Sequence, residues 1–196
     1  KTHYFQIPDE DHPRKIAYTV SGDLDGENIL ICLPGLLETK ESFSIIHAYF
    51  LKFENCKVIS VDFSGRGESD FIGEHGAYKM SLYLSDISQL IQGAVLTGGK
   101  AHQRITVLGT SMGGVLAMYL TQIFGKTINR AFACHVASIV FDIDFFGGKA
   151  ILRAVRFVGD DDDVMAFGQH VIDIATVFWL EFLNGGKNDT ARIDFK

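Results

Sequence analysis

The residues with the clearest chemical potential are Gly109-Thr110-Ser111-Met112-Gly113. They stand between an apolar run at 105–108 and a helix-like segment that begins at Gly114, which predicts a strand, a sharp turn and a helix. Small residues around Ser111 let the backbone reverse and lift the hydroxyl above the sheet edge, as in a nucleophile elbow. The Met112 amide would then lie at a helix start, where unpaired N–H groups favour an anion. This arrangement predicts serine attack on a carbonyl beside a ready oxyanion donor.

Two further blocks upstream have the same order of strand and turn. The apolar run 29–33 leads into Pro34-Gly35-Leu36-Leu37, and the run 58–61 leads into Asp62-Phe63-Ser64-Gly65-Arg66-Gly67-Glu68-Ser69. Short apolar runs of this kind are typical of buried parallel strands. Three such blocks in series predict one sheet with turns at its carboxyl edge.

These three blocks, within residues 14 to 143, strongly resemble the α/β-hydrolase family. The resemblance implies that Ser111 is the nucleophile, that the Leu36 and Met112 amides form the oxyanion hole, and that Asp62 stabilises its glycine-rich loop. It further implies an acyl-enzyme and hydrolysis of an ester or C–C bond in a small apolar carbonyl substrate. A serine at the elbow argues against the haloalkane dehalogenase and epoxide hydrolase branches, which use a carboxylate nucleophile.

The expected fold is α/β: a mostly parallel sheet with flanking helices and a helical cap, ending before the last two strands of the family. Apolar spacing predicts helices over 40–53 and from an N-cap at Ser81. The sixth strand is either 131–136 or 138–143, and we prefer the second, because Ile139-Val140-Phe141-Asp142 resembles the family's apolar strand ending in an acid. Asp142 is accordingly the candidate catalytic acid, with a loop-capping role as the alternative.

Residues 1–146 are therefore expected to form the N-terminal part of the hydrolase core, and residues 147–196 a cap-like helical segment. Apolar residues at helical spacing from Ile151 onward support this division. The substrate pocket would be lined by Leu37 and by three aromatic residues of the cap, Phe157, Phe178 and Trp179. The acidic run 160–163 lacks the spaced ligands of an EF-hand and is interpreted as solvated.

The family's histidine base has no counterpart at its usual place. His135 and His170 follow Ser111 in the family's chain order, but a structural role is the better interpretation of both. Two alternatives thus stay open: a hydrolase-like binding protein without turnover, or an N-terminal fragment that lacks the base. A sheet without its last strands would have an open edge, which predicts dimerisation or strand exchange.

Composition limits the other function classes. The net charge is −6 and no basic block is present, so a nucleic-acid partner is not expected. Three separate cysteines in apolar stretches indicate a reducing compartment, and no apolar run is long enough to span a bilayer, which predicts a cytoplasmic location. No metal or organic cofactor is expected; the predicted partner is a small-molecule substrate.

Overall fold

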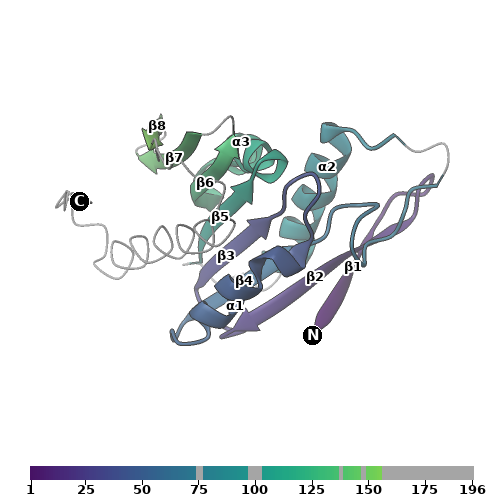
Figure 1. Ribbon diagram of the computed structural model, residues 1–196, viewed down its shortest axis with the longest axis horizontal. Helices are drawn as coiled ribbons and strands as arrows, with labels where there is room; N and C mark the ends of the chain where they lie inside the picture. The colour runs from purple at the N-terminus through teal and green to yellow at the C-terminus, as the bar shows by residue number, and fades with distance from the viewer. Residues whose placement is uncertain (74–76, 97–102, 137–138, 147–148, 156–196) are drawn as a thin grey trace. The chain divides into compact units, whose positions relative to one another are not determined.

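A mixed sheet forms the centre of the molecule (Figure 1). The computed structural model describes residues 1–73, 77–96, 103–136, 139–146 and 149–155. The strand order is β1-β2-β4-β3-β5-β6-β7-β8. The strands are β1 Thr2–Ile7, β2 Arg14–Gly22, β3 Asn28–Leu33, β4 Cys56–Val61, β5 Arg104–Thr110, β6 Ile128–Val136, β7 Ile139–Phe146 and β8 Lys149–Val155.

Strands β4, β3, β5 and β6 run parallel and bring their carboxyl ends to one edge. The pairs β1–β2, β2–β4, β6–β7 and β7–β8 are antiparallel. The central strands are apolar on both faces because both are covered by helices, as parallel sheets require. This confirms the predicted α/β fold with the three strand–turn blocks in adjacent strands.

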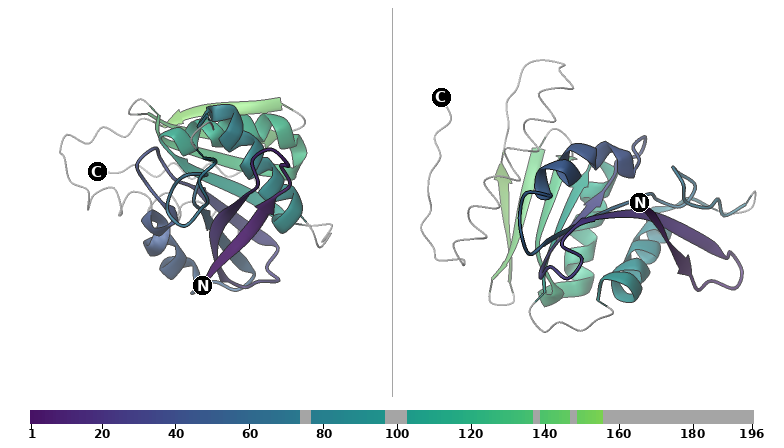
Figure 2. Two further views of the ribbon diagram at one scale, coloured as in Figure 1. Left: turned by 90° about the vertical axis from the view of Figure 1, so that its right-hand side faces the viewer. Right: turned by 90° about the horizontal axis from the view of Figure 1, so that it is seen from below.

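Helices cover both faces of the sheet (right view of Figure 2). One face carries α1 (Ser44–Phe50), which follows the 3-10 turn η1 (Lys40–Phe43). The other carries α2 (Met80–Leu90), continued by the π-helical η2 (Ile91–Val95), and α3 (Met112–Phe124), followed by the 3-10 turn η3 (Gly125–Thr127). The predicted N-cap of α2 was wrong: Lys79, in extended conformation, precedes the helix, and Ser81 lies within its first turn.

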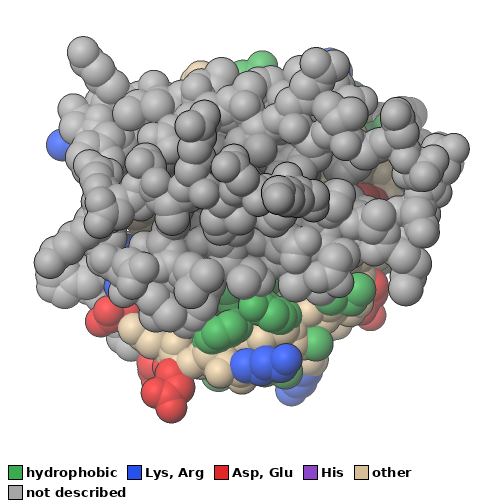
Figure 3. Space-filling view, turned by 60° about the vertical axis from the view of Figure 1, so that its left-hand side comes forward, with side chains coloured by type: hydrophobic (Ala, Val, Ile, Leu, Met, Phe, Trp, Pro, Cys, Tyr) green, Lys and Arg blue, Asp and Glu red, His purple; other side chains and the backbone are tan. Residues whose placement is uncertain are grey.

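The main hydrophobic core lies between the sheet and the face covered by α2 and α3. Fully buried side chains from both layers meet there, including Ile31, Val107, Ile87 and Leu116. At the lower edge of Figure 3, where described residues are visible, hydrophobic side chains lie beside acidic and basic ones on the surface. The core therefore fixes β5 and α3, the two elements that meet at Ser111.

The preference for residues 138–143 as the sixth parallel strand was wrong. Strand β6, Ile128–Val136, takes that place beside β5, and β7 turns back antiparallel to it. Residues 149–155, expected as the start of a helix, form β8 and pair with β7. Their spacing of apolar residues fits both a helix and a strand, so pairing with a neighbour decides between them. The other predicted cap helices lie outside the described residues.

Candidate active site

Ser111 occupies the sharp turn between β5 and α3. Its backbone has φ 49° and ψ −114°, and its side chain is exposed. Among the described residues other than glycine, only Asn55 shares a positive φ. The Ser111 amide donates to the Cys134 carbonyl of β6 at 2.7 Å, and its own carbonyl accepts the first helical bond, from Val115. The serine is therefore held in a conformation that costs about 1–3 kcal/mol and that its neighbours must maintain.

Glycine is required on either side of Ser111 because a Cβ at position 109 or 113 would clash with backbone atoms. A Cβ on Gly109 would lie 2.1 Å from the Gly113 carbonyl oxygen, and one on Gly113 would lie 2.2 Å from the Leu33 carbonyl oxygen. The first contact closes the turn upon itself, and the second brings the start of α3 against the end of β3. These close approaches explain why the sequence has glycine at both positions.

The turn after β3 lies directly beside Ser111. Glu38 donates its amide to the Gly35 carbonyl at 3.3 Å, which closes a turn with Leu36 and Leu37 at its tip. A Cβ on Gly35 would lie 3.4 Å from the Ser111 Cβ, which is van der Waals contact distance, so the two turns lie side by side. Leu36 is half exposed and Leu37 is 93% exposed. In a turn of this kind the two central amides are not used by the turn itself.

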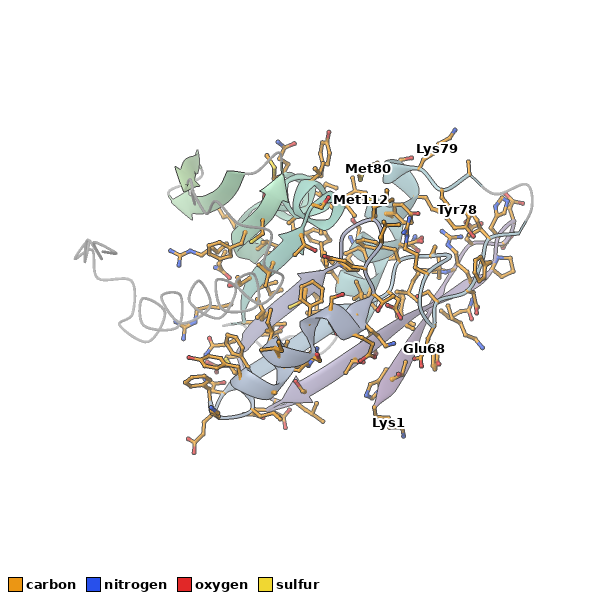
Figure 4. The ribbon with its side chains drawn as sticks, viewed as in Figure 1. Lys1, Glu68, Tyr78, Lys79, Met80 and Met112 are labelled. Carbon is orange, nitrogen blue, oxygen red and sulfur yellow. The ribbon has the colours of Figure 1, made fainter. Side chains whose placement is uncertain are left out.

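The Met112 amide is the second predicted oxyanion donor. Met112 is the first residue of α3, and the first intrahelical bond begins at Val115, so the amides ahead of it have no partner within the helix. The helix dipole adds partial positive charge at this end. Figure 4 shows Met112 at the start of α3. Two amide-bearing turns thus flank Ser111, one from the end of β3 and one from α3.

Glu38 is a residue near the site that we did not predict. Its Oε2 accepts the Gly35 amide at 2.7 Å and the Thr110 hydroxyl. A sequence signal existed, because an acid three residues after the start of a turn can reach back to its first amide, as in a capping box. Nothing local, however, shows that Thr110 would be its second partner.

The loop after β4 is held by a buried ion pair. Asp62 is fully buried, accepts the Lys40 side chain at 3.0 Å and the backbone amides of Lys40 and Glu68 at 2.7 and 2.9 Å, and touches the space where Gly67 would carry a Cβ. Burial alone would lower the pKa of Lys40, but its hydrogen bonds to Asp62 and Glu68 raise it above the ordinary value. Asp62 therefore serves the loop, as the sequence resemblance implied.

A second buried carboxylate, Asp86 of α2, braces the same loop from the other side. It binds the Arg14 guanidinium through both oxygens, at 2.5 and 3.2 Å, and accepts the Ser64 hydroxyl at 2.5 Å. Arg14 is 2% exposed, and although burial opposes its charge, the bonds to Asp86 and Asp9 raise its pKa. The two buried carboxylates, Asp62 and Asp86, thus both hold the loop in place by ion pairs and hydrogen bonds.

Asp142 lies within β7, away from the strand end that the sequence predicted. Its Cα pairs with that of Phe132 on β6, which pairs in turn with that of Leu108 on β5. Ser111 follows Leu108 by three residues, about 10 Å further along the strand direction. The structure therefore brings Leu36 and Met112 to Ser111, whereas Asp142 sits level with the middle of β5.

Two of the histidines with described side chains, His47 and His3, have partners away from Ser111. His47 is buried, with Nδ1 2.5 Å from the Ser21 hydroxyl and Nε2 2.8 Å from the Ser60 hydroxyl, and burial lowers its pKa. His3 stacks on Tyr18. None of the three histidines with described side chains, His3, His12 and His47, hydrogen-bonds the Ser111 side chain. His135 lies on β6, and His170, Phe157, Phe178 and Trp179 lie outside the described residues.

None of the three buried cysteines is a candidate nucleophile. Burial raises the pKa of the Cys56 and Cys134 thiols to about 12 and that of Cys32 further still. In the part of the chain that the structure describes, no three metal-binding side chains gather. The helices described there are all too short or too polar to cross a membrane.

A serine at positive φ between a strand and a helix, next to an amide-rich turn from the neighbouring parallel strand, is the defining geometry of the α/β-hydrolases. Solved structures agree with this class. A protein from Rickettsia typhi described as a hydrolase has a TM-score of 0.61 at 21% identity and matches 71% of this chain and 49% of its own. An α/β hydrolase from Novosphingobium aromaticivorans has a TM-score of 0.55 at 24% identity, over 68% and 43% of the two chains.

Sequence comparison names the family more narrowly. Residues 26–138 match the model described as serine aminopeptidase, S33, and the chain belongs to that family of hydrolases. A 3-hydroxybutyrate-oligomer hydrolase from Cupriavidus necator is 28% identical over 106 residues, which cover 54% of this chain and 33% of that protein. The thioesterase domain of a curacin biosynthetic pathway has a TM-score of 0.56 at 19% identity, over 68% and 46% of the two chains. The chain thus spans a third to a half of the length of these relatives.

Proposed function

We propose that the protein hydrolyses an ester or C–C bond of a small apolar carbonyl substrate through an acyl-enzyme at Ser111. The observation that carries the proposal is the strained, exposed Ser111 between two amide-bearing turns. A serine that only capped a helix would have no need of this conformation, which costs stability. The names of two similar proteins, an oligomer hydrolase and a thioesterase, favour transfer of an acyl group.

The reaction begins when a base removes the Ser111 proton and Oγ forms a bond to the substrate carbonyl carbon. The carbonyl oxygen becomes an oxyanion, which the amides of Leu36 and Met112 stabilise by hydrogen bonds. Collapse of this intermediate expels the leaving group, which takes the proton from the base, and leaves an ester on Ser111. Water, activated by the same base, then releases the acid and restores the serine.

The general base belongs to this proposal and has no assigned residue among those described. His47 cannot serve, because both of its ring nitrogens are occupied by serine hydroxyls. We assign no residue of this chain to the base, and the family's histidine would fill that role. The apolar side chain of Leu37, 93% exposed at the tip of the turn, would contact the substrate, with Phe157, Phe178 and Trp179 as further contacts. Asp142 remains a candidate acid.

Reaction with a fluorophosphonate, followed by intact-mass analysis, tests the proposal. We expect one adduct on the wild-type protein and none on the Ser111→Ala variant. Ser81→Ala is the matched control, because Ser81 is also an exposed serine in the first turn of a helix. An unlabelled wild-type protein would favour the alternative, a hydrolase-like protein that binds ligands without turnover.

A further inference from the structure

The Glu38 carboxylate joins two segments that each supply part of the candidate site. Its Oε2 accepts the Gly35 amide at 2.7 Å within the turn after β3, and it accepts the Thr110 hydroxyl at the end of β5. The two partners are far apart in sequence, with Thr110 72 residues beyond Glu38. The carboxylate therefore fastens one turn to the other.

Each fastened point directly precedes a group that would act in the reaction. Gly35 precedes Leu36, whose amide is the first proposed oxyanion donor, and Thr110 precedes Ser111. Thr110 is 4% exposed, so its side chain is held by the core and gives the carboxylate a firm anchor. Any movement of the turn after β3 changes the distance between the Leu36 amide and the carbonyl bound at Ser111.

The charge of Glu38 suits this task. A carboxylate accepts hydrogen bonds that are shorter and about twice as strong as those accepted by a neutral group. Both donors approach the same oxygen, Oε2, which lies 3.1 Å from the place where Gly35 would carry a Cβ. The Ser111 Cβ lies 3.4 Å from that same place. The Glu38 carboxylate and Ser111 thus both lie within van der Waals distance of the Gly35 Cα substituent position. Glu38 therefore supports the turn next to the serine.

We propose that Glu38 is a positioning residue, which holds the Leu36 amide at the distance from Ser111 that oxyanion stabilisation requires. The inference rests on the proposed function and adds a residue to it. Misplacing a reacting group by about 1 Å can cost roughly 100-fold in rate. Glu38 would act entirely through the turn, without contact to the substrate.

Labelling rates and amide exchange together test this role. We expect Glu38→Ala to lower the second-order rate of fluorophosphonate labelling by about 10- to 100-fold, because the phosphoryl oxygen occupies the oxyanion hole. Thr110→Val, of equal shape, should lower it by a smaller factor, since Gly35 keeps its bond. Glu38→Gln retains an acceptor oxygen and should stay within about threefold of the wild-type rate. Exchange of the Gly35 amide should accelerate strongly in Glu38→Ala and only slightly in Glu38→Gln, whose neutral oxygen is a weaker acceptor.

Glu41→Gln is the matched control, because Glu41 lies three residues further along, is 74% exposed, and its carboxylate pairs with Lys40 at 3.4 Å. It should change neither readout. Unchanged Gly35 exchange in Glu38→Ala would overturn the proposal whether or not the chain reacts with the probe. Faster exchange with an unchanged labelling rate would also overturn it. A wild-type protein that stays unlabelled but shows the predicted exchange pattern would refute the proposed function and leave the Glu38 contact established.

Discussion

The elbow after β5 and the loop after β4 both turn the chain at the same edge of the sheet, yet they are held by different forces. The elbow depends on close backbone approach, since a Cβ added to Gly113 would lie 2.2 Å from the Leu33 carbonyl oxygen. The loop depends on charge, with Asp62 bound to Lys40 and Asp86 bound to Arg14, all four buried. The elbow is therefore sensitive to added volume, and the loop to lost charge.

The largest effect is expected where volume is added to the elbow. Gly113→Ala places a methyl group against the Leu33 and Pro34 carbonyl oxygens, at 2.2 and 2.6 Å, and must push α3 away from β3. We expect a loss of more than about 3 kcal/mol in the free energy of unfolding, measured with urea, or no folded protein. Gln122→Ala, exposed on the same helix, should change it by less than about 0.5 kcal/mol. A Gly113→Ala protein of wild-type stability would contradict the steric account.

Breaking the charge pair in the loop should have the next largest effect. Asp62→Asn leaves the Lys40 ammonium buried at 3% exposure without its inner partner, which costs about 3–5 kcal/mol for a buried pair. Lys40→Met alone should also destabilise, because Asp62 then keeps only backbone donors. The double variant should be more stable than the sum of the two single losses predicts, as urea unfolding of all four proteins would show. Strict additivity would mean that the pair does not hold the loop.

Relief of the backbone strain at Ser111 should stabilise the protein, whereas the two preceding changes destabilise it. Ser111→Gly should raise the free energy of unfolding by about 1 kcal/mol relative to Ser111→Ala, because glycine adopts φ 49° without the cost that a Cβ imposes. Both variants should lose the fluorophosphonate adduct. If glycine were no more stable than alanine, the turn would not store strain, and the argument that Ser111 is kept for function would lose its energetic basis.

The smallest effect concerns pH and His47, which lies outside both turns. Burial lowers its pKa below the ordinary 6.5, so the unfolded chain takes up a proton at a higher pH than the folded protein does. The stability that the neutral histidine contributes is therefore complete above pH 6.5 and is lost as the pH falls from there to the lowered folded pKa. His47→Gln should flatten the stability profile in this window; an unchanged slope would mean that other groups dominate it.

Much of the site could be predicted because its determinants are contiguous. The elbow glycines, the turn after β3 and the loop beginning at Asp62 are each written within a few residues, and each follows an apolar run. The family match over residues 26–138 covers these same blocks. Their order alone indicated which turns would meet at one edge, since parallel strands place their carboxyl ends together.

The wrong predictions concern segments whose apolar pattern fits more than one strand or helix assignment. Residues 131–136 and 138–143 both fit a buried strand, and only the pairing of β6 with β5 shows which one continues the parallel sheet. The sequence Gly147-Gly148 is typical of a two-residue hairpin turn, and β7 pairs with β8. This pattern conflicts with the helices predicted from residue 147 onward. Sequence periodicity does not record which neighbour a strand will have.

The sequence by itself determined the α/β class, the elbow at Ser111 and its two neighbouring turns, because glycine freedom and apolar runs act locally. Only the tertiary structure decided the contacts across the chain. Glu38 meets Thr110 and Arg14 meets Asp86, each over a separation of 72 residues, and β7 places Asp142 level with the middle of β5. Such contacts depend on strand order and register, which arise from packing of the whole core and are not encoded in any one segment.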